Sequence, residues 1–120
     1  MSKRIQSTIK SLAIMATLVV IWGSLKKPEG EPSPLPHLDK LIHFGAYAFQ
    51  GVLYSLGFTT SPSKIIGFLI FLGLGVEFAQ WPLPYRYFSV LDFLANGLGA
   101  LYGVLFFRGL LDFRNTSGSN

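Results

Sequence analysis

Four long apolar segments, separated by short polar stretches, dominate this sequence of 120 residues. They cover about residues 5–25, 39–58, 64–81 and 89–107. The last three come close to the ~20 residues that a helix needs to cross a bilayer. None carries the polar stripe of a soluble surface helix, and none alternates as a strand of a membrane barrel does. The sequence therefore predicts an all-α fold, a four-transmembrane-helix bundle that forms a single membrane domain over residues 1–120.

The stretches between and beside these segments have their own character. Lys3 and Arg4 give the first segment a basic start like that of a signal peptide, but Ile21-Trp22-Gly23 is a poor cleavage site, so we expect an uncleaved anchor helix. Residues 26–38 contain four prolines and predict an extended, solvated loop on the outer side. Residues 115–120 predict a disordered tail.

The cations of the chain indicate its orientation. The formal charge is +4, but the ten Lys and Arg residues are scattered without a basic face, so a nucleic-acid partner is not expected. Four crossings place both termini on one side, together with six of the cations. These are Lys3, Arg4, Lys10, Lys64, Arg108 and Arg114. Because cationic flanks stay inside, both termini are predicted to be cytoplasmic.

Ionisable and hydrogen-bonding residues lie at the segment ends that this topology places outside. Spacings of three and four put the members of each group on one helix face. A polar group inside an apolar run is costly, so each of them needs an explanation. The candidate polar site consists of Asp39, His43, Glu77, Gln80, Arg86, Ser89, Asp92 and Asn96.

Several of these residues also have an ordinary structural explanation, which stays open. Ser89 with Asp92 resembles a capping box, and Asp39 is suited to cap the second segment. A lone His43 or Asn96 is suited to an interhelical hydrogen bond. Lys40 is expected to act as an interfacial anchor.

Glu77 is harder to explain by local structure alone. A carboxylate at a helix C-terminus is disfavoured by the helix dipole, so we expect Glu77 to pair with Arg86. The small residues Ala95, Gly99 and Gly103 form a ridge that permits close helix packing, with homodimerisation as the alternative. The oligomeric state is not predicted.

Missing motifs narrow the chemistry. The chain has no Cys, and it contains no phosphate-binding Gly-rich loop, no HExxH and no GxSxG. His43, Glu77 and Asp92 are suitable ligands for a divalent cation, but no metal and no cofactor is predicted. Acid–base catalysis by His43 and a carboxylate stays open, and whether the chain is an enzyme is left undecided.

The same residues occur in a recognisable order. DKLIHF at residues 39–44, EFAQ at 77–80, RYFS at 86–89, then Asp92 and ANGLG at 95–99 resemble the VanZ-like family over about residues 37–107. The resemblance implies a small multi-pass protein of the bacterial cytoplasmic membrane. The founding member of the family is associated with low-level resistance to the glycopeptide teicoplanin. The resemblance implies no defined biochemical activity.

Three functions are consistent with these observations. The leading hypothesis is an envelope protein whose outer polar pocket binds a lipid headgroup or a lipid-linked cell-wall component, with Arg86 on a phosphate or carboxylate. The alternatives are a membrane enzyme that acts on such a lipid and a structural subunit in which the polar residues only hold the helices together.

Overall fold

The computed structural model describes residues 2–26, 38–84 and 90–118, except for the side chains of residues 38–39 and 110–118. These residues form four helices: α1 (Lys3–Leu25), α2 (Leu38–Gly57), α3 (Pro62–Gln80) and α4 (Val90–Gly118). No strand occurs in the described parts of the chain. The predicted all-α fold with four helices is therefore confirmed.

The start of α3 and the end of α4 differ from the predicted positions. Ser61 occupies the N-cap position of α3, and Pro62 takes the first helical position, where its missing N–H costs nothing. α3 therefore begins two residues before the expected Lys64. α4 continues to Gly118, so residues 115–118, which were expected in a disordered tail, belong to this helix. Gly109 lies inside it, because one glycine does not end a helix.

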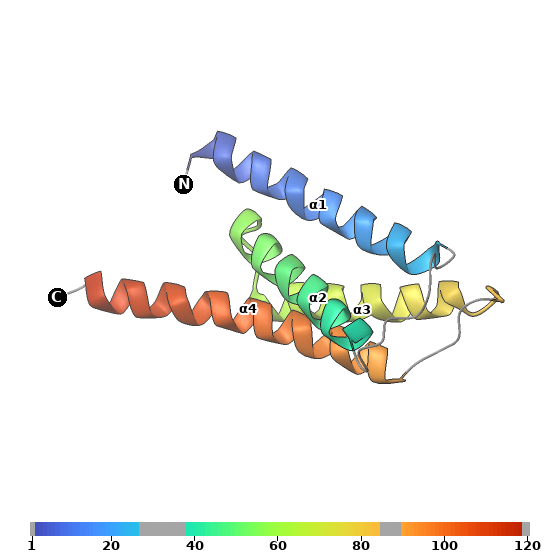
Figure 1. Ribbon diagram of the computed structural model, residues 1–120. Coiled ribbons are helices and arrows are strands. Elements are labelled where there is room, and N and C mark those ends of the chain that lie inside the picture. The colour runs from blue at the N-terminus through green and yellow to red at the C-terminus, as the bar shows by residue number, and fades with distance from the viewer. Residues whose placement is uncertain (1, 27–37, 85–89, 119–120) are drawn as a thin grey trace.

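The four helices alternate in direction, which gathers the chain ends on one side. Figure 1 shows the N- and C-termini at the same end of the bundle, with the α2–α3 connection. We call this the terminal end. The opposite end, where α1 and α3 finish and α2 and α4 begin, is called the polar end. α2 packs most extensively against α4 and also contacts α1, whereas α1 and α3 touch little.

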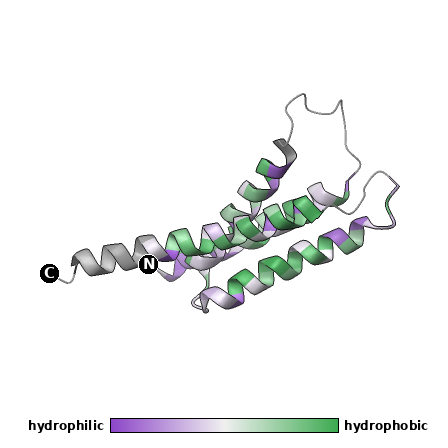
Figure 2. Ribbon diagram, turned by 90° about the horizontal axis from the view of Figure 1, so that it is seen from below, coloured by the Kyte–Doolittle hydropathy of each residue, from purple (hydrophilic) through white to green (hydrophobic). Residues whose placement is uncertain are grey.

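The outside of the bundle is apolar. Large side chains such as Phe71, Leu41 and Trp22 are mostly exposed, whereas Gln50 and Glu77 are buried. Figure 2 shows hydrophobic residues along the helices and hydrophilic ones mainly towards their ends. This is the arrangement expected of helices surrounded by lipid rather than water.

Three of the helices are long and apolar enough to cross a membrane: Lys3–Leu25, Pro62–Gln80 and the first part of α4, Val90–Gly109. The chain is therefore a helical bundle of the membrane type. α2 is of similar length but is not among these three helices. Its crossing and the cytoplasmic location of both termini stay predictions.

Small residues allow α2 and α4 to touch through their backbones. A Cβ atom at Gly99 would collide with the carbonyl of Phe44, and one at Gly103 would collide with the carbonyl of Ala48. From the other side, a Cβ at Gly51 would lie 3.1 Å from the carbonyl oxygen of Ala100. The glycine ridge predicted from the sequence therefore packs within the chain, against α2.

Gly99→Ala is expected to lower the free energy of unfolding by about 1–3 kcal/mol, because the added methyl group meets rigid backbone rather than a side chain that can move. Gly45→Ala is the matched control, since a Cβ there meets no atom within 4 Å. Thermal unfolding of the two variants in detergent measures the difference. Equal stability would show that the α2–α4 contact is not as close as described.

Candidate functional site

One face of α2 carries a row of polar side chains. Lys40, His43, Tyr47, Gln50 and Tyr54 follow one another at intervals of three, four, three and four residues. This spacing places all five on one side of a helix. The sequence does not predict this stripe, because a polar stripe on a helix is normally interpreted as a solvent-exposed face. Here it faces the neighbouring helices, and Tyr47 and Gln50 are fully buried.

At the polar end this stripe meets α4. The ring of His43 lies with Nδ1 2.9 Å from Oδ1 of Asn96, and because an amide oxygen only accepts, His43 is the donor. His43 Nε2 lies 3.9 Å from Oδ2 of Asp92, and Lys40 Nζ lies 3.2 Å from Oδ1 of Asp92. Lys40, His43, Asp92 and Asn96 are called the polar cluster below.

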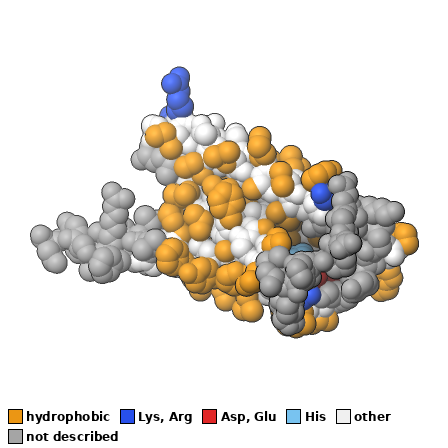
Figure 3. All heavy atoms as spheres, viewed as in Figure 1, with side chains coloured by type: hydrophobic (Ala, Val, Ile, Leu, Met, Phe, Trp, Pro, Cys, Tyr) orange, Lys and Arg blue, Asp and Glu red, His pale blue; other side chains and the backbone are white. Residues whose placement is uncertain are grey.

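The members of the polar cluster differ in exposure. The side chains of Lys40, His43 and Asp92 are 30%, 25% and 20% exposed, whereas Asn96 is buried beneath them. Figure 3 shows basic, acidic and histidine side chains gathered at one end of a largely hydrophobic surface. The polar cluster thus combines partly exposed charged groups with a buried amide next to them.

Glu77 and Gln80 on α3 have roles separate from that of the polar cluster. Glu77 is only 2% exposed, and its carboxylate is close enough to the Tyr47 hydroxyl to act on it electrostatically. A Cβ at Gly73 would lie 3.5 Å from Asn96 and 3.6 Å from the Tyr47 hydroxyl, so both of these groups lie next to α3. Gln80 turns towards α1 and donates from Nε2 to the carbonyl of Ser24 at 2.7 Å.

The structure thus joins His43, Asp92 and Asn96 directly and brings Glu77 close to them, while Gln80 ties α3 to α1. The side chain of Asp39 and the whole of Arg86 and Ser89 lie outside the described residues, as does the expected pair of Glu77 with Arg86. Lys40, expected as an interfacial anchor, also forms an ion pair with Asp92, because one turn of helix brings it onto the same face as His43.

The chemistry available to the polar cluster follows from its donors and acceptors. The Nδ1 atom of His43 donates to Asn96. The Nε2 atom of a neutral His43 is therefore a hydrogen-bond acceptor, whereas a protonated His43 forms an ion pair with Asp92. Lys40 adds a cation and Asp92 an anion to the same cluster. Among the described residues, no three His, Asp or Glu side chains are grouped as a metal site requires, so the His43, Glu77 and Asp92 ligand set is not formed.

A second polar group lies deeper, between α1 and α2. The Tyr54 hydroxyl donates to Thr17 Oγ1 at 2.6 Å, and Thr17 donates to Oε1 of Gln50 at 2.9 Å. Gln50 in turn donates to the carbonyl of Ala46 at 3.4 Å. These groups satisfy one another, which is the usual role of such residues between membrane helices. We assign them to helix packing.

Comparison with known proteins agrees with this arrangement. The model of the VanZ/LLP1 family matches residues 2–112. The chain belongs to the VanZ/LLP1 family. A protein of the fission yeast Schizosaccharomyces pombe, named only as uncharacterized protein C11E3.10, is 33% identical over an alignment of 101 residues. The alignment covers 80% of this chain and 61% of that protein. The chain thus spans less than two thirds of that relative. No solved structure matches this VanZ/LLP1 protein significantly.

Asn96→Ala in this VanZ/LLP1 protein is expected to lower the free energy of unfolding by about 1–3 kcal/mol, because His43 Nδ1 then loses its acceptor in a partly buried position. Leu98→Ala serves as the control, since Leu98 is on the same helix and largely exposed. Chemical denaturation in mixed micelles measures both. If the two variants lost the same stability, the His43–Asn96 hydrogen bond would not hold α2 and α4 together.

Proposed function

We propose that the polar cluster binds the polar headgroup of a membrane lipid, or of a lipid-linked cell-wall component, at the outer surface of the bacterial cytoplasmic membrane. The observation that carries the proposal is the partly exposed Lys40–Asp92–His43 arrangement above a buried amide. It offers a cation, a carboxylate and an imidazole to one molecule. A headgroup with a phosphate and hydroxyl or amine groups has complementary acceptors and donors.

Buried polar groups support a binding role. Tyr47 is 1% exposed, and no described group hydrogen-bonds its hydroxyl. A buried hydroxyl without a partner is costly and calls for an explanation, and the polar part of a ligand would supply the missing bond. Glu77 and Asn96 lie around the same hydroxyl and give the interior of the site its polarity.

The surroundings of the cluster favour a lipid over a soluble ligand. Leu41 and Ile42 on α2, and Val90 and Leu91 on α4, are all more than half exposed, in the same helix turns as Lys40 and Asp92. Charged groups between exposed apolar ones fit the boundary between hydrocarbon and headgroups. The similarity to a yeast protein favours a lipid headgroup over a component found only in bacterial cell walls. An effect on teicoplanin susceptibility would follow if the bound lipid carries cell-wall precursors.

A second candidate function is acid–base catalysis on the bound lipid. It is favoured by His43, whose Nδ1 is held by Asn96 while Nε2 faces Asp92 and remains accessible from the polar end. An imidazole fixed in this way is suited to take up or deliver a proton. Arg86, which the sequence assigns to the same end, stays a predicted contact to the anionic part of the ligand.

Lys40→Gln is expected to remove one of the anionic lipid molecules that remain with each purified protein molecule, because a charge-assisted contact of the polar cluster is lost. Lys3→Gln is the matched control, which removes an exposed lysine at the other end. Native mass spectrometry of the full chain measures the retained lipid, and thermal unfolding checks that both variants fold. Retention equal in both variants would contradict the proposal, and a parallel loss of folding would favour the structural alternative.

His43→Gln separates binding from catalysis. If the cluster only binds, the variant retains less lipid, because the contact of the imidazole is lost, and neither protein converts the lipid. If His43 transfers protons, turnover of the lipid that is still bound also falls, by about 10²–10⁴-fold, the usual contribution of an acid–base group. Mass analysis of lipids incubated with the two proteins is the measurement. Identical lipid profiles with and without the wild-type protein would contradict the enzymatic alternative.

A further inference from the structure

A cavity lies at the terminal end of the bundle, at the opposite end from the polar cluster. Its volume is about 470 Å³, and it is bordered by the end of α2, the α2–α3 connection and α4. Hydroxyl groups and one guanidinium provide its polar lining. The polar residues are Ser55, Thr59, Thr60, Ser61 and Arg108.

Arg108 brings a positive charge to this cavity. Its Nη2 donates to the carbonyl of Thr60 at 2.8 Å, and its buried Nε has no hydrogen-bond partner. Among the described residues, no carboxylate forms an ion pair with this guanidinium. A guanidinium has five N–H donors in a planar fork, which suits a phosphate or carboxylate. Thr60 accepts a hydrogen bond from Nη2 only, so the guanidinium has donors left for an anion.

Ser55 provides an independent sign of a ligand. This residue of α2 is 8% exposed and lines the cavity, and its hydroxyl is buried without a hydrogen-bond partner. Buried hydroxyls are normally paired with protein or with a bound molecule. Its position beside Arg108 matches a molecule that accepts hydrogen bonds from both.

The start of α3 adds to the positive potential. Ser61 occupies the N-cap position of this 19-residue helix, but its side chain makes no capping hydrogen bond. Its hydroxyl instead lies 3.3 Å from that of Ser63. The first turn of a helix carries partial positive charge, which favours anions.

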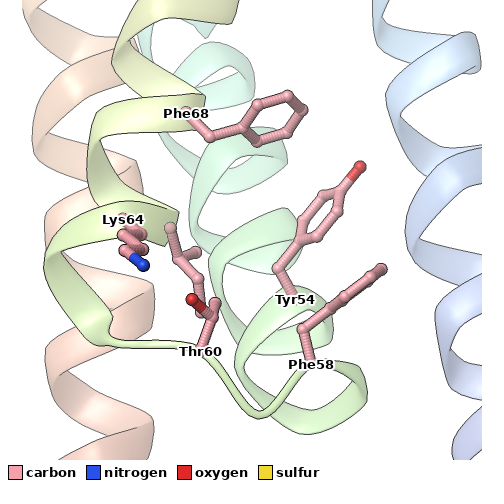
Figure 4. Close-up of a pocket in the computed structure, with 6 residues that line it drawn as sticks. Tyr54, Phe58, Thr60, Lys64 and Phe68 are labelled. Carbon is pink, nitrogen blue, oxygen red and sulfur yellow. The ribbon is translucent and has the colours of Figure 1, made fainter.

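An apolar cavity adjoins the polar one. It has a volume of about 200 Å³ and is lined by Tyr54, Phe58, Thr60, Lys64, Ile65 and Phe68. Figure 4 shows the aromatic side chains of Tyr54, Phe58 and Phe68 around this space, with Lys64 and Thr60 at its side. Phe58 and Thr60 line both cavities, so a polar compartment and an apolar compartment meet there.

We propose that the cavity at the terminal end binds the phosphate group of an anionic membrane lipid. Arg108, Ser55 and the first turn of α3 contact the phosphate, and the acyl chain passes Phe58 into the apolar cavity. Lys64 adds a second cation at the border. Inorganic phosphate satisfies the polar groups alone, but only a lipid also fills the aromatic compartment. This site is separate from the polar cluster and does not depend on the function proposed there.

Ser55→Ala and Arg108→Gln test the site, with Ser11→Ala and Arg4→Gln as matched controls from the exposed surface of α1. The full chain in phosphatidylcholine nanodiscs is titrated with phosphatidylglycerol or with inorganic phosphate, and binding is followed by native mass spectrometry. We expect phosphatidylglycerol to bind, and both test variants to bind it at least about tenfold more weakly. Both controls should bind it like the wild type.

Thermal unfolding without added lipid separates binding from folding. Ser55→Ala should be as stable as the wild type, because it removes a hydroxyl that has no partner. Unchanged phosphatidylglycerol binding in Ser55→Ala and Arg108→Gln would overturn the proposal. Phosphate binding as tight as lipid binding would also overturn it, because the apolar compartment would then contribute nothing.

Discussion

The contact of α2 with α4 is the interaction on which the rest of the structure depends. Gly99 and Gly103 let the backbone of α4 meet the carbonyls of Phe44 and Ala48. Because the two helices touch at this depth, the first turns of α2 set His43 against Asn96. The last turns bring Ser55 to the same cavity as Arg108. One close helix crossing therefore positions the polar groups at both ends of the bundle.

The need to enclose polar groups explains why α2 is placed against two helices. Its stripe would be costly in hydrocarbon, so its polar face is covered by α1 and α4 while apolar residues cover the outside. Gln50 of α2 accepts a hydrogen bond from Thr17 and donates one to the carbonyl of Ala46 on the same helix. The hydroxyls of Tyr47, halfway along α2, and of Ser55, near its end, have no hydrogen-bond partner among the described residues.

Much of this arrangement could be predicted from apolar segment lengths and from polar residues at their ends. The four helices, the close packing of the glycine ridge and the meeting of His43 with Asp92 and Asn96 follow from such patterns. The role of Lys40 could not be predicted, because it depends on how α2 is rotated against α4. The bond of Gln80 to Ser24 and the cavity at Arg108 bring together parts of the chain far apart in sequence. No local pattern specifies such contacts.

The central claim, that the polar cluster holds a lipid headgroup, is tested most directly by solid-state NMR in bilayers. In a His37→Gln background, ¹⁵N-labelled His43 is the single histidine, and its dipolar coupling to lipid ³¹P reports the distance to the headgroup. A phosphate hydrogen-bonded to Nε2 places phosphorus within about 4–5 Å of that nitrogen. The account predicts a coupling of that size that disappears in Asp92→Asn or Lys40→Gln. No measurable coupling in the wild-type protein would contradict it.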